Sequence, residues 1–354
     1  MSTVNIALVG LGFMGEAHAT CYRRDARVRL AAVADLDAER RREFCGRFAV
    51  GRSVADWREL LADPGIDVVD VTAPNFLHAE IAEAAIRAGK GLIVEKPLAL
   101  DLAAAGRVLQ ALREKPVLAM YAENRLFAPV FVKARDCLRQ GDLGEPLILR
   151  VNELGSGPTH SRWFWDRSRT GGGAQIDLGI HGLCMAEWLL DSPIVSVQAL
   201  TGTLRWKDRA ASGVEDSSMA MVRFANGAFG QFICSWGIQG GLDIRAELFG
   251  STGSLYLDQS TTINGLRVYQ SEAVGGGESR PHQASRIGWS YPVVDEWNVK
   301  GHSAELRHYV DCFLAGRQTE SPLSRGYRAL RLVLAIYEAA AAGRELAVSE
   351  GLDE

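Results

Sequence analysis

The stretch VNIALVGLGFMG, residues 4–15, determines the fold of the N-terminal half of the chain. Its first half is mostly apolar and predicts a buried strand, and its second half follows the pattern G-x-G-x-x-G and leads into a helical pattern. In this context Gly10 allows a tight turn, Gly12 lets the backbone approach a pyrophosphate, and Gly15 permits close packing of helix on strand. The stretch therefore predicts a dinucleotide-binding βαβ unit.

Phe13 and Met14 lie in the same turn, where free backbone N–H groups and the helix dipole would hold the phosphates. A second predicted strand, 29–34, ends in Asp35, twenty residues beyond Gly15. An acid at this place accepts hydrogen bonds from the hydroxyls of the adenosine ribose, and it repels a 2′-phosphate. The pattern therefore predicts NAD as the cofactor, in preference to NADP.

Strands and helices keep alternating up to residue 122, which is typical of a doubly wound parallel sheet, a Rossmann domain. Further strands are predicted at 66–72, 91–94 and 117–121, and helices at 54–62, 75–88 and 101–113. From residue 123 the alternation stops. We therefore expect an α/β protein with an NAD-binding domain, residues 1–122, and a substrate-binding and oligomerisation domain, residues 123–354.

The tripeptide Glu95-Lys96-Pro97 follows the apolar strand 91–94. The carboxyl edge of a parallel sheet is where open α/β proteins bind ligands, so these residues are candidates for the site. Lys96 offers a point charge whose pKa responds to burial, and a cis peptide at Pro97 would aim it. The alternative is an ordinary strand end with a solvated lysine.

Three residues after the strand 66–72 face the same edge. Pro74 and Asn75 follow the strand directly, Asn75 as a candidate helix cap, and His78 comes one turn later. We count all three, with Glu95 and Lys96, as candidate cofactor contacts. For His78 the alternative is a packed histidine without chemistry.

The overall composition excludes several classes of function. The chain has 354 residues, a net charge of −4 and no block of Lys and Arg, so nucleic acid and anionic membranes are not its expected partners. Six scattered cysteines without a C-x-x-C pair indicate reduced thiols and a cytoplasmic protein, with no structural zinc. No apolar run approaches the roughly 18 residues of a membrane span.

In the second half, the segment 171–190 begins with three glycines and becomes helical. Asp177 and His181 are four residues apart, so a helix places them on one face. A carboxylate beside an imidazole orients it and raises its basicity, as a general base requires. The alternative is a buried pair that only secures the helix.

The loop before this helix is rich in aromatic residues. Trp163 and Trp165, with His160 nearby, would form a platform for a sugar ring, or the tryptophans anchor the second core; both interpretations stay open. Asn124 and Arg125, just beyond the domain boundary, are further candidates for substrate contacts.

After residue 193 the apolar pattern changes to a period of two. Strands are predicted at 194–206, 217–224, 228–236 and 243–249, separated by Gly or Asn-Gly turns. They indicate a large, mostly antiparallel open sheet with one face on helices. We expect the other face to be covered by self-association, in a homodimer or homotetramer.

Several motifs together resemble one family: GLGFMG, the acid Asp35, APNFLH, EKP and GGGAQIDLGIH. The chain resembles the Gfo/Idh/MocA family, named for glucose–fructose oxidoreductase, inositol dehydrogenase and the rhizopine protein MocA. The resemblance implies NAD(P)-dependent oxidation or reduction of a sugar, cyclitol or glycoside carbon. It also places the family's catalytic lysine, aspartate and histidine on Lys96, Asp177 and His181. Many members have a further aspartate three residues after the histidine, where this chain has Cys184, and this departure concerns the identity of the substrate.

Two other functions compete with this prediction. A sensor or regulator of sugar metabolism would keep the nucleotide site without catalysis, but it has no need of Lys96, Asp177 and His181 together. A reductase of another Rossmann family would lack the D-x-G-x-H element. No metal is expected in the reaction.

Overall fold

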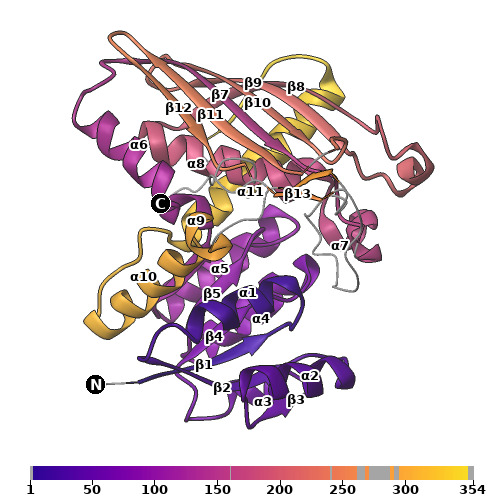
Figure 1. The fold of residues 1–354 in the computed structure, drawn as a ribbon, viewed down its shortest axis with the longest axis vertical. Coiled ribbons are helices and arrows are strands. Elements are labelled where there is room, and N and C mark those ends of the chain that lie inside the picture. Colours follow the sequence, from indigo (N-terminus) through magenta and orange to yellow (C-terminus); the bar gives the residue numbers. More distant parts are fainter. Residues whose placement is uncertain are drawn as a thin grey trace. The chain divides into compact units, whose positions relative to one another are not determined.

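The computed structural model describes residues 3–349, except 160, 240, 261–267, 271–287 and 291–294 (Figure 1). The chain forms two compact units. The first comprises residues 1–128 and 300–330, and the second comprises residues 129–299 and 331–354. Among the described residues, no helix combines the length and the hydropathy that a membrane crossing requires.

The first unit is built on a six-stranded sheet whose paired strands are all parallel, in the order β3-β2-β1-β4-β5-β6 (Figure 1). The strand order reverses between β1 and β4, which is the point where a doubly wound sheet binds its ligand. The prediction of a doubly wound Rossmann sheet is therefore confirmed. The strands are β1 (Val4–Val9), β2 (Val28–Ala34), β3 (Ser53–Val54), β4 (Val68–Val71), β5 (Gly91–Glu95) and β6 (Ala119–Ala122).

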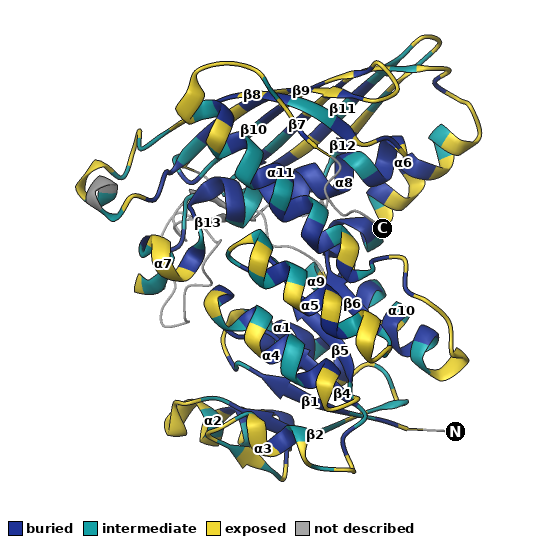
Figure 2. Ribbon diagram, turned by 180° about the vertical axis from the view of Figure 1, so that it is seen from behind, coloured by how far each residue is buried: buried dark blue, intermediate teal, exposed yellow. Residues whose placement is uncertain are grey.

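Helices pack on this sheet, and Figure 2 shows β1, β4 and β5 buried between them. The helices are α1 (Phe13–Tyr22), α2 (Ala38–Phe48), α3 (Arg58–Leu61), α4 (Asn75–Arg87), α5 (Leu102–Glu114), the short η1 (Asn124–Phe127) and α10 (His302–Ala315). Although α10 comes from the far end of the sequence, it packs against α1 and η1.

Two local predictions in this unit are wrong, and one helix was not predicted. The helix predicted at 54–62 shrinks to α3, because β3 occupies its start and Asp56 accepts a hydrogen bond from the Arg58 backbone, which delays the helix. Asn75 is not a cap: it is the first residue of α4, and the extended Pro74 holds the cap position. The helix α2, which Asp37 caps, was not predicted.

The second unit contains a seven-stranded sheet in the order β12-β11-β7-β10-β9-β8-β15. Its neighbouring strands are antiparallel except for β7 and β10, which run parallel. The prediction of a mostly antiparallel open sheet is confirmed. The strands are β7 (Pro146–Leu154), β8 (Ile194–Gly202), β9 (Ser217–Phe224), β10 (Phe229–Ser235), β11 (Asp243–Gly250), β12 (Ser254–Asp258) and β15 (Leu346–Ala347).

One face of this sheet packs on helix α8 (Ile180–Leu190), which is buried along most of its length (Figure 2). A π-helix, η3 (Gln175–Gly179), leads directly into it. The remaining elements are α6 (Pro129–Arg139), η2 (Arg162–Trp165), α7 (Arg167–Thr170), η4 (Lys207–Ser212), the pair β13 (Val268–Gln270) and β14 (Gly288–Ser290), α9 (Glu296–Val299) and α11 (Leu323–Ala342).

Candidate active site

The glycine-rich turn between β1 and α1 has room for a phosphate. Gly10 has φ +93°, and a Cβ there would lie 2.6 Å from Ala73 Cα. A Cβ on Gly15 would collide with the carbonyl oxygen of Gly10, whereas one on Gly12 would meet no described atom within 4 Å. Gly12, at the N-cap of helix α1, has no side chain to bond the first turn, and the N-terminus of a helix presents backbone N–H groups and a positive dipole end that suit an anion. The turn therefore fits the pyrophosphate of NAD.

Asp35, at the end of β2, is fixed beside this turn. Its Oδ2 accepts a hydrogen bond from the Leu11 backbone N–H at 2.9 Å. Its Oδ1 accepts one from the Asp37 backbone N–H, also at 2.9 Å. Arg40 Nη1 lies 3.2 Å from both carboxylate oxygens. This arrangement holds an acceptor next to the glycine turn, where an adenosine ribose would bind, and ribose contact by Asp35 stays a prediction.

His78 joins two loops at the carboxyl edge of the sheet. Its Nε2 lies 2.6 Å from the carbonyl oxygen of Ala73, and its Nδ1 lies 2.7 Å from that of Pro97. Burial lowers the pKa of His78, although two carbonyl acceptors are best matched by an imidazole with both nitrogens protonated. The ring thus ties the loop after β4 to the loop after β5. Direct cofactor contacts of Pro74, Asn75 and His78 stay predictions.

The tripeptide after β5 has the predicted cis peptide between Lys96 and Pro97. Glu95 is buried, and its Oε2 accepts a hydrogen bond from the Lys96 backbone N–H at 3.1 Å. Burial opposes the ionisation of Glu95, but the hydrogen bond and charge of His18, with the charge of Lys96, lower its pKa to about 2. The carboxylate is therefore ionised, directly beside the proposed catalytic lysine.

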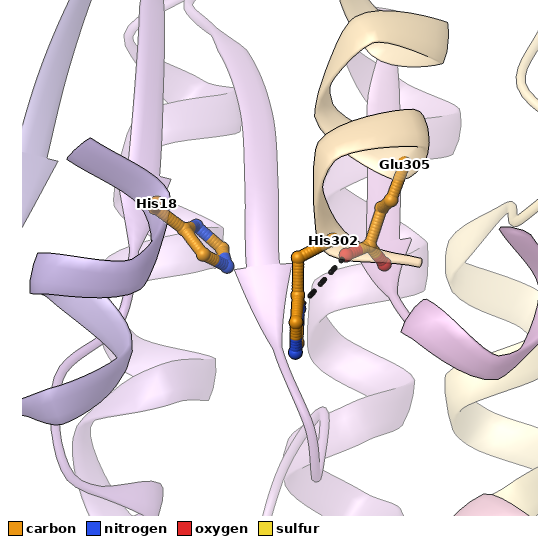
Figure 3. Close-up of side chains that lie close together, drawn as sticks. All are labelled: His18, His302 and Glu305. Atoms are coloured by element: carbon orange, nitrogen blue, oxygen red, sulfur yellow. Dashed lines mark ion pairs between the residues drawn. The ribbon is translucent and has the colours of Figure 1, made fainter. Parts of the chain in front are cut away.

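One group of side chains in the first unit has the composition of a metal site. His18, His302 and Glu305 are buried, and one potential ligand atom from each lies within 4.8 Å of the others (Figure 3). The sequence predicts no metal, and these three residues were not among the predicted site residues.

In the second unit, the start of the helix that carries Asp177 and His181 is held by Glu215. The Glu215 carboxylate accepts hydrogen bonds from the backbone N–H groups of Gly173 and Gln175, each at 2.9 Å. It also accepts a hydrogen bond from the Tyr337 hydroxyl, at 3.0 Å. Because Glu215 fixes these N–H groups, the backbone enters the helix at a defined angle.

Asp177 lies in the π-helix η3, a conformation that often marks functional sites. Its Oδ2 accepts a hydrogen bond from the indole N–H of Trp236 at 3.1 Å. His181 follows in α8 and is 8% exposed. The segment is helical, as predicted, but its first turn is a wider π-turn. The orientation of His181 by Asp177 stays a prediction.

The aromatic loop is divided between core and surface. Trp165 is buried, donates its N–H to the Pro158 carbonyl at 3.1 Å and packs edge-on against Trp236 at 5.1 Å. Core anchoring, one of the two interpretations, therefore describes Trp165. Trp163 is half-buried and stacks on Phe164 with ring centroids 4.1 Å apart. Sugar contacts of Trp163 and Trp165 stay predictions, and His160 lies outside the described residues.

Asn124 and Arg125 belong to η1 of the first unit, and both are buried. The Asn124 amide donates to the Lys300 carbonyl oxygen at 2.6 Å, so it helps to hold the segment that returns before α10. Their contact with substrate stays a prediction. Cys184, at the place of the aspartate expected from the resemblance, is buried in α8.

Comparison with known proteins identifies the family. Residues 4–123 match the oxidoreductase family with an NAD-binding Rossmann fold, and residues 131–256 match the GFO/IDH/MocA C-terminal domain. A myo-inositol 2-dehydrogenase of Thermotoga maritima is 30% identical, over 73% of this chain and 77% of that protein. The chain belongs to the Gfo/Idh/MocA family.

Solved structures agree with this family assignment. GenD2 from gentamicin A biosynthesis, in complex with NAD, is similar with a TM-score of 0.91 at 32% identity, covering 99% of this chain and 97% of that chain. Levoglucosan dehydrogenase, in complex with NADH and levoglucosan, gives 0.84 at 28% identity, covering 99% and 100%. This Gfo/Idh/MocA protein is an NAD-dependent oxidoreductase, and the prediction of NAD is confirmed.

Sequence reasoning missed three residues of the site in this Gfo/Idh/MocA protein. His18, Glu215 and Trp236 each contact a predicted site residue or the backbone beside it. Each acts across a long sequence separation, for example 59 residues between Asp177 and Trp236. The sequence could show only that a polar side chain or an indole N–H lies within an apolar segment, and this pattern does not identify the residue that it contacts.

Proposed function

We propose that this Gfo/Idh/MocA oxidoreductase transfers a hydride between NAD and a hydroxyl-bearing carbon of a sugar, cyclitol or glycoside. One observation carries the proposal. The phosphate-binding turn after β1 and Lys96 after β5 lie at the carboxyl edge of the same parallel sheet, so a cation is available at the edge where the dinucleotide binds. The named activities of the relatives support the substrate class.

Each proposed residue has one task. NAD, when bound, accepts or supplies the hydride at C4 of its nicotinamide. Lys96 would hold the reacting oxygen and stabilise the negative charge that develops on it. His181, oriented by Asp177, would take the hydroxyl proton during oxidation. Residues 1–122 would form the cofactor domain and residues 123–354 the substrate domain, although α10 of the latter packs with the NAD-binding unit.

The experiment is a survey of NAD reduction, followed at 340 nm, across sugars, inositols and glycosides. Turnover of one substrate class, lowered by about a hundredfold or more in the Lys96→Met variant, supports the proposal. Tight NAD binding without turnover of any compound would instead favour the sensor function. Turnover of amino-acid semialdehydes or imines alone would favour a reductase of a different kind.

We also propose a homodimer or homotetramer that forms through the outer face of the seven-stranded sheet. Large apolar side chains alternate outward from its strands: Leu200 is 72% exposed, Met219 51%, Met221 59%, Phe229 51% and Tyr256 71%. Neighbouring strands bring some of them side by side, since Leu200 pairs with Met219 in register and Phe229 pairs with the 46% exposed Ile148. A second copy on this face would remove these apolar side chains from water.

We place the protein in the cytoplasm. All six cysteines are free, and four of them are buried: Cys21, Cys184, Cys234 and Cys312. Free thiols of this kind suit a reducing compartment. A protein recovered with its cysteines in disulfides would contradict the assignment.

A further inference from the structure

The NAD-binding unit contains a buried polar cluster that the proposed reaction does not use. His18 comes from α1, Asp70 from β4, Glu95 from β5, and His302 and Glu305 from α10. Of these five residues, the most exposed is His302, at 7%. Figure 3 shows the His18 ring pointing from α1 toward His302, and the two ring centroids are 6.3 Å apart. Burying ionisable groups costs free energy unless they are paired, so the contacts within the cluster determine which of its groups carry a charge.

His18 lies between two carboxylates. Its Nδ1 is 2.8 Å from Asp70 Oδ2, and its Nε2 is 3.2 Å from Glu95 Oε1. The contact of Nε2 with Glu95 is an ion pair and not a well-directed hydrogen bond, so it needs the charge of the ring. The imidazolium can donate to Asp70 through Nδ1 and attract Glu95 through its positive charge, whereas a neutral imidazole has no charge to offer Glu95. The Tyr22 hydroxyl also donates to Asp70 Oδ2, at 2.7 Å, which fixes this end of the chain of contacts.

The charges agree with this interpretation. Burial opposes the protonation of His18, but the charges and hydrogen bonds of Asp70 and Glu95 raise its pKa well above the ordinary value. On the α10 side, burial lowers the pKa of His302 and raises the pKa of Glu305 far above the usual range, so both are neutral. The positive charges of the His18 imidazolium and of Lys96 then balance the negative charges of Asp70 and Glu95.

We propose that His18 is a positioning residue, which as an imidazolium anchored on Asp70 holds the Glu95 carboxylate and, through it, sets the place of Lys96. The geometry gives the path: His18 Nε2 contacts one oxygen of Glu95, and the other oxygen accepts the Lys96 backbone N–H. His18 is too deeply buried to meet substrate. The inference rests on the proposed role of Lys96 in the reaction.

Two substitutions separate the contacts of His18. His18→Asn can keep a bond to Asp70 at the Nδ1 position but loses the reach to Glu95, and His18→Gln places an amide donor near the former Nε2. We expect His18→Asn to lower kcat by about tenfold to a hundredfold, the scale of a misplaced catalytic group, while KM and NAD affinity change little. His18→Gln should recover part of this loss, because its amide donates to Glu95 but carries no charge.

The pH profile gives a second readout. Wild-type Glu95, with a pKa of about 2, is ionised at every pH where the enzyme is assayed. In His18→Asn the Glu95 carboxylate loses the contact that lowers its pKa most, so its pKa rises. Protonation of Glu95 should then lower kcat at a higher pH than in the wild type, which adds an acidic limb to the pH profile. The groups facing His18 are Asp70, Glu95, Tyr22, Cys21, His302 and Glu305. Cys21 and Tyr22, whose pKa values are raised, stay uncharged in this range.

A double-mutant cycle distinguishes this inference from the proposed function. If His18 acts through Lys96, His18→Asn should cost little more in the Lys96→Met background, because residues of one unit are not additive. Full turnover in Lys96→Met would contradict the role of Lys96 itself. A large loss in Lys96→Met with normal kcat in His18→Asn would overturn only the inference about His18.

Structural and metal-binding roles predict other results. His308→Gln, a half-buried histidine of α10 away from the cluster, is the matched control and should keep wild-type kcat. If His18 only stabilises the fold, His18→Asn lowers Tm and the folded protein keeps its kcat, which overturns the inference. The inference is also overturned if the purified protein contains a stoichiometric divalent metal and both His18→Asn and His302→Ala lose it.

Discussion

Trp236 donates its indole N–H to Asp177 Oδ2 at 3.1 Å, across 59 residues of sequence. The ring is 1% exposed and packs against Trp165 and Phe164 with centroids 5.1 and 6.4 Å away. A donor so rigidly packed fixes one oxygen of the proposed catalytic carboxylate. The packing of Trp236 in the aromatic core of the second unit therefore restricts the position of the Asp177 carboxylate.

We expect Trp236→Phe to lower turnover by about tenfold, because the half-buried Asp177 carboxylate loses a hydrogen bond while most of the ring packing remains. Trp206→Phe is the matched control. It removes the hydrogen bond from Trp206 to the Trp236 carbonyl oxygen and leaves Asp177 untouched. Steady-state kinetics and Tm on both variants check the prediction, and equal turnover in the two would count against it.

Lys96→Met should leave NAD affinity nearly unchanged and lower turnover by about a hundredfold or more, the scale of losing one stabiliser of an oxyanion. Titration of NAD and initial rates measure the two effects separately. Lys115→Met, which removes a lysine that contacts only the Arg87 carbonyl among its described hydrogen bonds, should behave as wild type. Normal turnover in folded Lys96→Met would contradict its assigned role.

For the predicted acid–base pair, removal of either member should cost much the same. We expect His181→Ala to lower turnover by roughly a hundredfold to ten-thousandfold and Asp177→Asn to lower it as well, with NAD affinity unchanged. The opposite result, a large loss of Tm in both variants with unimpaired turnover of the folded protein, would mean that the pair only supports its helix.

The preference for NAD should depend on Asp35. Replacing Asp35 with Ser and the 84% exposed Leu36 with Arg removes the charge that repels a 2′-phosphate and adds one that attracts it. The double variant should bind NADP more tightly and NAD more weakly in a direct titration. Tighter binding of NADP than of NAD by the unmodified protein would disprove the prediction.

Self-association should depend on the apolar face of the seven-stranded sheet. A charge introduced by Met221→Glu would be buried without a partner in the assembly, so we expect a shift toward monomer in sedimentation. The control is Leu314→Glu on α10, where a 40% exposed apolar residue lies outside this face. A wild type that sediments as a monomer would contradict the proposal.

The sequence predicts best what depends on local pattern. The strands β1 and β9 have the predicted bounds, because runs of apolar residues and strict alternation are visible without the partner strands. The helix α2 was missed because charged residues dominate it and only Phe44 and Phe48 are buried. Asp37, which accepts from the N–H groups of Glu39 and Arg40, was the usable signal for its start.

The candidate site was predictable only where chemistry lies in short motifs. The glycine turn, Glu95-Lys96-Pro97 and the pair Asp177 and His181 are such motifs. The groups that hold them are not, since His18, Glu215 and Trp236 reach their partners through the tertiary fold. No spacing rule could place His302 near His18 before the return of α10 to the first unit was known.

The central claim, hydride transfer between a substrate carbon and NAD, is tested most directly with deuterium. The best substrate of the survey, deuterated at its hydroxyl-bearing carbons, is incubated with NAD, and the NADH formed is analysed by mass spectrometry. The account predicts NADH carrying one deuterium at C4 and a slowed rate. Formation of NADH without deuterium would contradict it.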